Sequence, residues 1–568
     1  MMKRIITTLS LVAILGIATN ASDRKETEMK AIACRQLTGV AVNGSRSNQQ
    51  QQVSLLMKDD MLSVYGADAG GFVVVSRDDR FPAVIGYSST AFDTTDMPDG
   101  FSWWLKEASL SMQRRIDDNN WLTALTPSEV IVEPMLTTKW SQKEPYNLLC
   151  PKIVGERCPT GCVATAAAQV MKFFNYPAQG RGTATYTKMG RTLEAEINNV
   201  YDWNNMKNNY AESQKTLTDA NRAVATLMFD VGAASSMEYQ MGYGSSSLRY
   251  CAKGLGDNFQ YDSLALRLLY REYYSETEWN DLVTNELVNE HRPILYAGNP
   301  KDGSAGHAFV FDGIDAGGLV HVNWGWGGKC DGYFSMDLLQ PGAEAEQRGN
   351  YSYNNNMLIG ITPRETPAEG AEEHSMWVFN PTCELSIDAT DSLVLTTGGI
   401  YNLDYRYFYG RLLITMDNVN GSDEDSHNII IYDSEEVDEE DGEAAGPVPF
   451  GYGFSLVENE GDKTGSATIV WLKDEELKAG TYIVSLVTQA LKEPTPSLLR
   501  GPGGVVCQYT LTKGEDGSLT LTAGVPTAIS NTFVKQPRND DAIYNLKGQK
   551  VSRTGKGIYI VDSKKVRL

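Results

Sequence analysis

The chain has 568 residues, enough for several domains, and carries 72 acidic against 50 basic side chains. The resulting net charge of −22 argues against nucleic acid or an anionic membrane surface as a partner. Part of this charge is local, because residues 423–443 contain 11 acidic side chains and no Lys or Arg. Such a block is typical of a solvated loop, and a calcium site there is the open alternative.

The first 21 residues are predicted to be a secretory signal peptide. Lys3 and Arg4 give the charged start, an apolar run follows over residues 5–17, and small residues end at Ala21. The apolar run is too short to anchor the chain in a bilayer. We therefore expect a secreted protein, with attachment to the cell surface as a further option.

Residues 22–133 are predicted to form a small α+β domain. Buried strands are expected over residues 71–76 and 83–87, on either side of a polar turn. A helix is expected over residues 101–116. These elements alone assign no function to the domain.

The motif around Cys162 is predicted to be a tight turn that runs into a helix. Pro159 and Gly161 mark the turn, Thr160 is a candidate cap, and residues 163–174 have apolar side chains at helical spacing. A thiol at the positive end of a helix dipole is expected to have a lowered pKa, which favours the nucleophilic thiolate. A buried, inert cysteine is the alternative.

A cysteine nucleophile needs a base, a group that orients the base, and an oxyanion hole. His307 opens a strand-like segment after a Gly-rich loop, 145 residues beyond Cys162, and Asn323 follows 16 residues later. This order and separation are typical of papain-type cysteine peptidases. Upstream, Gln142 offers an amide for an oxyanion, although most loop glutamines only meet solvent.

Four segments together resemble the streptopain family of bacterial papain-like cysteine proteases, and most of all its interpain branch. They are residues 140–147, 160–166, 306–310 and 321–328. The resemblance implies that Cys162 is the nucleophile, His307 the base and Gln142 the oxyanion donor, with Asn323 and Trp324 supporting the histidine. It also implies a preference for an apolar residue two positions before the cut.

The substrate cleft is expected between a helical first half and a strand-rich second half of the region 134–363. Strands are predicted over residues 293–297, 307–314, 319–324, 332–336 and 355–361. The resemblance implies that a small-residue loop borders the cleft, with a plain turn as the alternative. The residues expected at the substrate are Gly244, Ser245, Ser246, Ser247, Gly306 and Trp326.

The resemblance also assigns the domain at residues 22–133 as a propeptide, which would act as an intramolecular inhibitor by covering the cleft. Residues 87–93 are a candidate for the blocking segment. Of the eight cysteines, seven remain beside the nucleophile and cannot all pair, so no disulfide scaffold is expected. No second ligand pair follows Cys158 and Cys162, so no metal and no cofactor are expected.

After a linker rich in Pro, Gly and Glu, short strands over residues 376–525 predict an immunoglobulin-like β-sandwich, assigned to residues 364–525. Residues 526–568 look like a small β module. This module resembles sorting domains of the type IX secretion system, which would make that machinery a partner, and a sheet that caps the sandwich is the alternative.

The fold class expected is α+β, with a papain-like two-part catalytic domain, an α+β propeptide and a C-terminal β-sandwich. The function expected is that of a secreted cysteine endopeptidase, made as a zymogen, with proteins and peptides as substrates. Two alternatives stay open. One is a catalytically inactive adhesin on a protease fold, and the other is an acyltransferase that uses the same Cys–His pair.

Overall fold

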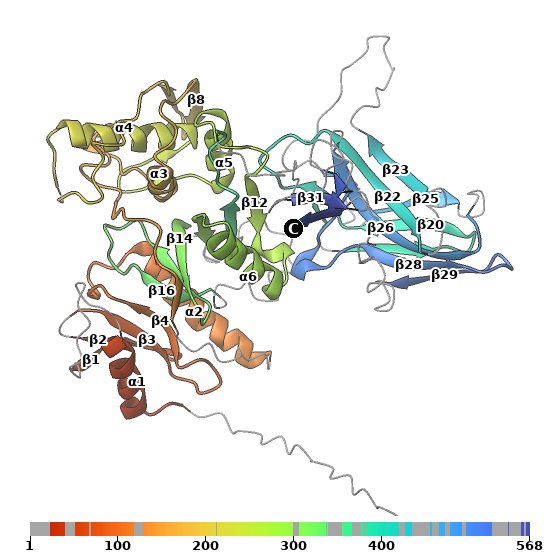
Figure 1. Cartoon of the computed structure of the whole chain (residues 1–568), viewed down its shortest axis with the longest axis horizontal. Helices are drawn as coiled ribbons and strands as arrows, with labels where there is room; N and C mark the ends of the chain where they lie inside the picture. The colour runs from red at the N-terminus through yellow and green to blue at the C-terminus, as the bar shows by residue number, and fades with distance from the viewer. Residues whose placement is uncertain are drawn as a thin grey trace, which may run out of the picture.

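The structure is a computed structural model, and it confirms the α+β fold class. It describes residues 23–39, 52–67, 70–118, 129–211, 213–298, 306–336, 338, 355–365, 377–379, 382–419, 427–433, 455–456, 465–471, 477–490, 496–524, 543–544, 558–561 and 564–567. The predicted signal peptide and most of the acidic stretch lie outside these residues. Figure 1 shows the N-terminal part at the lower left, the helices of residues 162–257 above it, and the C-terminal sandwich at the right.

The N-terminal part is a four-stranded antiparallel meander with a helix on it. Helix α1 (Glu26–Gly39) packs on strands β1 (Val53–Lys58), β2 (Leu62–Ala67), β3 (Phe72–Ser76) and β4 (Val84–Ser88). Helix α2 (Asp99–Asp117) follows and buries Phe101, Trp103 and Trp104. The strands and the helix expected in this region are confirmed.

The region that is expected to be catalytic, residues 134–363 and called the catalytic region below, has its helices first and its sheet second, as predicted. Helices α3 (Cys162–Phe174), α4 (Asp219–Ala234) and α5 (Leu248–Asp257) pack together, and α3 also lies on β14. Helix α4 begins at its cap, Thr218, whose hydroxyl accepts from the backbone N–H of Asn221 at 3.2 Å.

The sheet of the catalytic region is continuous with the N-terminal meander. Its strands are β12 (Arg267–Tyr270), β13 (Ile294–Gly298), β14 (His307–Asp315), β15 (Leu319–Asn323), β16 (Gly332–Ser335) and β17 (Asn356–Ile359). Strand β4 pairs with β16, which yields one sheet in the order β1-β2-β3-β4-β16-β15-β14-β13-β17-β12, with β5 (Val130–Val132) beside β14. The N-terminal part is therefore joined to the catalytic region by backbone hydrogen bonds as well as by side chains.

Helix α2 seals this junction with aromatic side chains. Trp104 is 1% exposed, its indole N–H donates to the carbonyl of Ser335 at 3.2 Å, and its ring lies 4.8 Å from that of Phe334. Burying indole and phenyl rings at a junction contributes on the order of 1.5–3 kcal/mol for each ring. The helix thus packs on the catalytic sheet as part of one core.

The C-terminal part is a β-sandwich with its own apolar core. One sheet contains β19 (Cys383–Ile387), β20 (Ser392–Thr397) and β25 (Gly465–Trp471). The other contains β22 (Gly410–Asn418), β23 (His427–Asp433), β26 (Gly480–Ala490), β28 (Gln508–Lys513) and β29 (Leu519–Ala523). This confirms the predicted all-β region.

Two arginines attach the sandwich to the catalytic region. Arg500 pairs with Glu278 at 3.0 Å and lies 4.3 Å from the ring centre of Tyr274, and Arg406 donates to the carbonyl of Ser263 at 2.8 Å. Beyond the sandwich, β30 (Ile543–Tyr544), β31 (Ile558–Val561) and β32 (Lys564–Arg567) form a small antiparallel sheet. Among the helices described, none has the length and apolarity needed to cross a bilayer.

Candidate active site

Cys162 is the first residue of α3, as the sequence predicted. The residue before it, Gly161, has φ +86°, and a Cβ there would lie 2.5 Å from the sulfur of Met237. Both the backbone conformation and the packing therefore require glycine directly before Cys162. The predicted cap at Thr160 is wrong, because its hydroxyl bonds to the hydroxyl of Thr165 at 2.7 Å and Gly161 occupies the cap position.

His307 is the first residue of β14, and this strand lies against α3. The Cys162 thiol meets the backbone N–H of Ala308, and the charge of Asp99 acts on both Cys162 and His307. The topology thus brings the two predicted catalytic side chains to the same place, with the start of α2 beside them. Among the hydrogen bonds of the described residues, none joins Cys162 to His307.

Burial shifts the pKa values of Cys162 and His307 in opposite directions. Burial raises the pKa of the Cys162 thiol, against a smaller opposite effect from the backbone N–H groups of Ala308, Val163 and Cys162 itself. Burial also lowers the pKa of the His307 imidazole, which Asp99 partly opposes. The lowered thiol pKa expected from the helix dipole is therefore outweighed here by desolvation. Burial thus favours the neutral thiol and the neutral imidazole.

Asn323 ends β15 and sits opposite Val310 in the register of β14, three residues from His307. Its side chain is 3% exposed and accepts from Gln169 Nε2 at 3.0 Å and from the N–H of Gly325 at 3.0 Å. Its own amide donates to the carbonyl of Thr138 at 3.0 Å. The structure thus places Asn323 beside β14, the strand that His307 begins. The side-chain amide of Asn323, however, is hydrogen-bonded to Gln169 of α3 and to Thr138, which precedes α3.

Trp324 lies under the start of α2. Its ring is 4% exposed and lies 4.8 Å from the ring of Phe309 and 5.7 Å from that of Phe101. Its indole N–H donates to the carbonyl of Cys330 at 2.9 Å. A Cβ on Gly100 would come within 3.0 Å of this indole, so the helix backbone rests directly on the ring.

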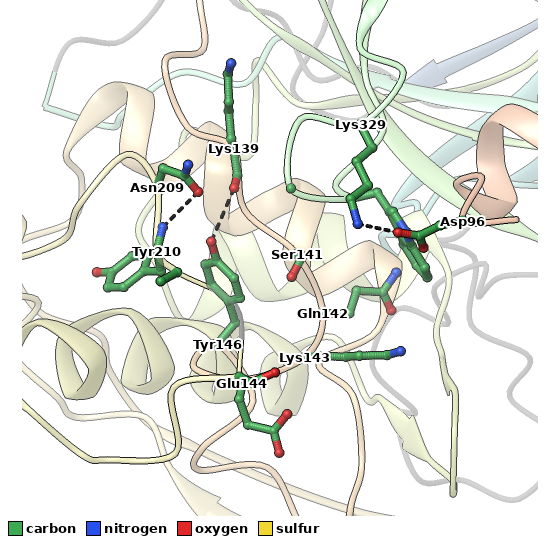
Figure 2. Close-up of a pocket in the computed structure, with 14 residues that line it drawn as sticks. Asp96, Lys139, Ser141, Gln142, Lys143, Glu144, Tyr146, Asn209, Tyr210 and Lys329 are labelled. Atoms are coloured by element: carbon green, nitrogen blue, oxygen red, sulfur yellow. Dashed lines mark hydrogen bonds and ion pairs between the residues drawn. The ribbon is translucent and has the colours of Figure 1, made fainter. Parts of the chain in front are cut away.

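Gln142 lines a cavity of about 380 Å³ together with Trp326, Lys143 and Lys329. Its backbone carbonyl accepts from the N–H of Thr160 at 3.0 Å, which ties the Gln142 loop to the turn before Cys162. Figure 2 shows Gln142 and Lys143 at this cavity, together with an ion pair between Lys329 and Asp96 of the N-terminal part. The pKa of Asp96 is lowered by this contact and by a hydrogen bond from the Trp326 side chain.

The small-residue loop lies on another side of the same turn. Gly244 and Ser245 form β11 (Gly244–Ser245), and a Cβ on Gly244 would lie 3.0 Å from the Cα of Gly161. The hydroxyls of the next two serines have structural partners. Ser246 donates to the carbonyl of Ser235, and Ser247 caps α5. Gly306, half-buried, directly precedes His307.

His321, the second histidine of this sheet, has a structural partner. Its Nδ1 lies 2.6 Å from Oδ1 of Asp312, whose other oxygen accepts from the N–H of Leu136 at 2.9 Å. Burial alone would lower the pKa of His321, but Asp312 outweighs it and the pKa is raised. This pair fastens the chain before Cys162 to the sheet.

A buried polar row on α3 was missed by the sequence reasoning. Thr165 and Gln169 are fully buried, and Gln169 accepts from the Thr138 hydroxyl at 3.0 Å and from the Trp140 N–H at 3.2 Å. These residues follow Cys162 at i+3 and i+7, which is one face of a helix. Two polar side chains on the cysteine face of an alanine-rich helix were a signal that could have identified them.

Within the described residues, no group of three or more His, Cys, Asp or Glu side chains could hold a metal ion. The candidate groups of the site are the thiol of Cys162, the imidazole of His307 and the side-chain amide of Gln142. This set is suited to acyl transfer by a covalent route.

Two family profiles match the chain. The peptidase C10 family matches residues 140–334, and the Spi protease inhibitor matches residues 19–112. Streptopain of Streptococcus pyogenes serotype M28 is 32% identical over 373 residues, which are 60% of this chain and 92% of that protein. The thiol protease/hemagglutinin PrtT of Porphyromonas gingivalis is 34% identical over 328 residues, 53% of this chain and 36% of PrtT.

Two solved structures are also similar. A fragment of prointerpain A from Prevotella intermedia, which carries a cysteine-to-alanine substitution, is 36% identical with a TM-score of 0.49. The match covers 55% of this chain and 99% of the fragment. Active interpain A from the same organism is 39% identical with a TM-score of 0.35, over 41% of this chain and 95% of that one.

Proposed function

Because this chain belongs to the peptidase C10 family, we propose that Cys162 is the nucleophile with which it hydrolyses peptide bonds within proteins. The chain is a cysteine peptidase with an inhibitor-like propeptide. The observation that carries the assignment of Cys162 is its position at the head of α3, facing the backbone of Ala308 beside His307.

In the proposed reaction, His307 takes the proton of Cys162, and the thiolate attacks the carbonyl carbon of the scissile bond. The N–H of Cys162 and the amide of Gln142 hold the developing oxyanion, since the Gln142 loop is tied to the turn before Cys162. His307 then gives its proton to the leaving amine. It next activates water, which hydrolyses the thioester and frees Cys162.

In the proposed precursor, the start of α2 keeps the catalytic site inactive. The helix start brings Asp99 near both catalytic side chains, Gly100 rests on Trp324, and burial holds thiol and imidazole neutral. We propose that departure of α2 reverses both pKa shifts, because solvent then reaches the sulfur and the ring. Asn323 and Trp324 would support His307 in that open form.

The blocking segment proposed here is the start of α2. Residues 87–93 begin instead within the sheet, where Tyr87 of β4 pairs with Tyr333 of β16 and the Ser88 hydroxyl donates to the carbonyl of Asp331 at 2.5 Å. Their contacts fasten the propeptide to β16. The charge that acts on Cys162 and His307 comes from Asp99.

We further propose export through the predicted signal peptide, sorting through the C-terminal module, and a preference for an apolar residue two positions before the cut. The loop of Gly244 and Ser245 is the candidate wall for that residue, together with Met237 beside Gly161. Gly306 and Trp326 are proposed to line the cleft on either side of His307 and Gln142.

The test is labelling and digestion by the processed enzyme. A thiol-reactive epoxide should modify Cys162 and abolish hydrolysis of casein, and the products in water should be fragments. An adhesin on a protease fold would leave casein whole, and an acyltransferase would yield crosslinked products. Loss of casein hydrolysis in a Cys162→Ala variant that unfolds at the wild-type temperature would assign the activity to this thiol.

A further inference from the structure

Two buried thiols meet inside the C-terminal sandwich, far from the catalytic site. Cys383, 8% exposed, begins β19 in one sheet, and Cys507, 1% exposed, directly precedes β28 in the other sheet. Their side chains are in hydrogen-bonding contact. The contact therefore bridges the two sheets of the sandwich shown at the right of Figure 1.

The backbone holds both cysteines in regular structure. Cys383 is paired with Thr397 in the register of β19 and β20, and the carbonyl of Cys507 accepts from the N–H of Leu486 on β26 at 3.0 Å. The side chain of Tyr509 is hydrogen-bonded to the backbone of Leu385, which ties β28 to β19 on the same face. The two sulfurs are thus kept adjacent by the sheets around them.

Other roles for this pair fit the surroundings less well. No third metal-ligating side chain joins the two thiols within the described part of the chain. Other buried cysteines have partners of another kind, since Cys150 bonds to the Tyr239 side chain and Cys251 to Ser235. Cys383 and Cys507 are distinguished by the fact that each is the partner of the other.

We propose that Cys383 and Cys507 form a disulfide that crosslinks the two sheets in the exported protein. The bond forms by thiol–disulfide exchange with a disulfide oxidant: each cysteine loses a proton, the two sulfurs are oxidised and join, and the oxidant is reduced to two thiols. Export, proposed above, supplies the compartment in which such bonds persist. A crosslink between distant positions restricts the unfolded chain strongly and so stabilises the sandwich.

The proposed bond also separates two kinds of cysteine chemistry in one chain. Cys162 must stay reduced to act, and it lies at the head of α3, outside the sandwich. The disulfide is buried between sheets, so mild reductant that maintains the Cys162 thiol would reach it slowly. The sandwich is then expected to stay folded and crosslinked in the thiol-containing buffers in which the peptidase is assayed.

The first test maps the sulfurs directly. The full chain carrying Cys162→Ala, which prevents self-digestion, is equilibrated with oxidised glutathione, alkylated under denaturing conditions without reductant, and digested for mass spectrometry. The expected result is one linked peptide pair that contains Cys383 and Cys507, with Cys251 alkylated. Alkylation of both Cys383 and Cys507 in the oxidised sample would overturn the proposal.

A second test measures the effect on stability. Strong reductant should lower the unfolding temperature of the sandwich by several degrees in the Cys162→Ala chain. The chain that also carries Cys383→Ala and Cys507→Ala should lose this dependence on reductant, whereas a matched Cys251→Ala control should keep it. Equal unfolding temperatures with and without reductant in the parent chain would contradict the proposal, and the peptide map decides alone if the triple variant does not fold.

Discussion

Trp103 offers a way to loosen the propeptide without touching the catalytic residues. It lies on α2, is 5% exposed, and faces the catalytic sheet: a Cβ on Gly298 would come within 2.2 Å of its ring, and its ring centre lies 6.1 Å from that of Phe309. The Trp103→Ala substitution removes this contact and leaves Trp104 in place. We expect the closed precursor to open more often.

The size of the effect follows from the burial. Replacing a buried Trp by Ala costs about 3–5 kcal/mol. If part of this cost falls within the propeptide, the low end, about 3 kcal/mol, is the better guide to docking. Since 1.4 kcal/mol is tenfold in an equilibrium constant, the open fraction of the precursor should rise about a hundredfold.

The assay is the rate at which an active-site-directed epoxide labels Cys162 in the uncut precursor, because only the open form reacts. The matched control is Trp103→Phe. The indole N–H of Trp103 is buried and has no hydrogen-bond partner among the described residues, so Trp103→Phe loses no hydrogen bond and keeps part of the buried ring. We expect roughly hundredfold faster labelling for Trp103→Ala, and labelling of Trp103→Phe between that of the wild type and that of Trp103→Ala. Equal labelling of all three proteins, with the propeptide folded in each, would refute the idea that α2 closes the site.

Three further predictions concern the same region. First, burial raises the pKa of Cys162 in the precursor. The rate of alkylation of its thiol should therefore increase only at a pH above the ordinary thiol range, and after processing this increase should occur at lower pH. Identical pH profiles of alkylation for the precursor and the processed enzyme would contradict this. Second, Gln169→Leu leaves the backbone N–H of Trp140 and the side-chain oxygen Oδ1 of Asn323 each short of a partner, at about 1–3 kcal/mol for each buried group. The unfolding temperature and kcat should both fall, and a wild-type melting curve would argue against the network. Third, Asp96→Asn removes a partly exposed ion pair worth about 0.2–1 kcal/mol, so epoxide labelling should quicken by no more than about fivefold and lose its salt dependence. An effect as large as that of Trp103→Ala would show that the ion pair, and not the helix, holds the precursor closed.

The parts of the fold with strong local patterns were predictable. The strands at His307–Asp315, Leu319–Asn323 and Gly332–Ser335 were found within a residue or two, because their apolar runs are bounded by glycine-rich turns. The helix at Cys162–Phe174 was found because alanine favours helices and Gly161 stops the preceding turn. These strands and this helix are determined by residues that are close together in the sequence.

What could not be predicted depends on contacts between distant segments. The pairing of Tyr87 with Tyr333 joins two domains in one sheet, and nothing in either strand alone specifies its partner. The same holds for Asp99, whose effect on Cys162 and His307 depends on where α2 docks. The raised pKa of Cys162 was missed because desolvation by burial is a tertiary effect, whereas the helix dipole follows from the local sequence.

The central claim is that Cys162 cuts peptide bonds with His307 as its base. The most direct measurement is mass spectrometry of the purified precursor incubated alone under reducing conditions, beside its Cys162→Ala and His307→Ala variants. The account predicts that the wild-type chain loses its propeptide while both variants stay whole and folded. Processing of the Cys162→Ala chain at the wild-type rate, with no other protease present, would contradict it.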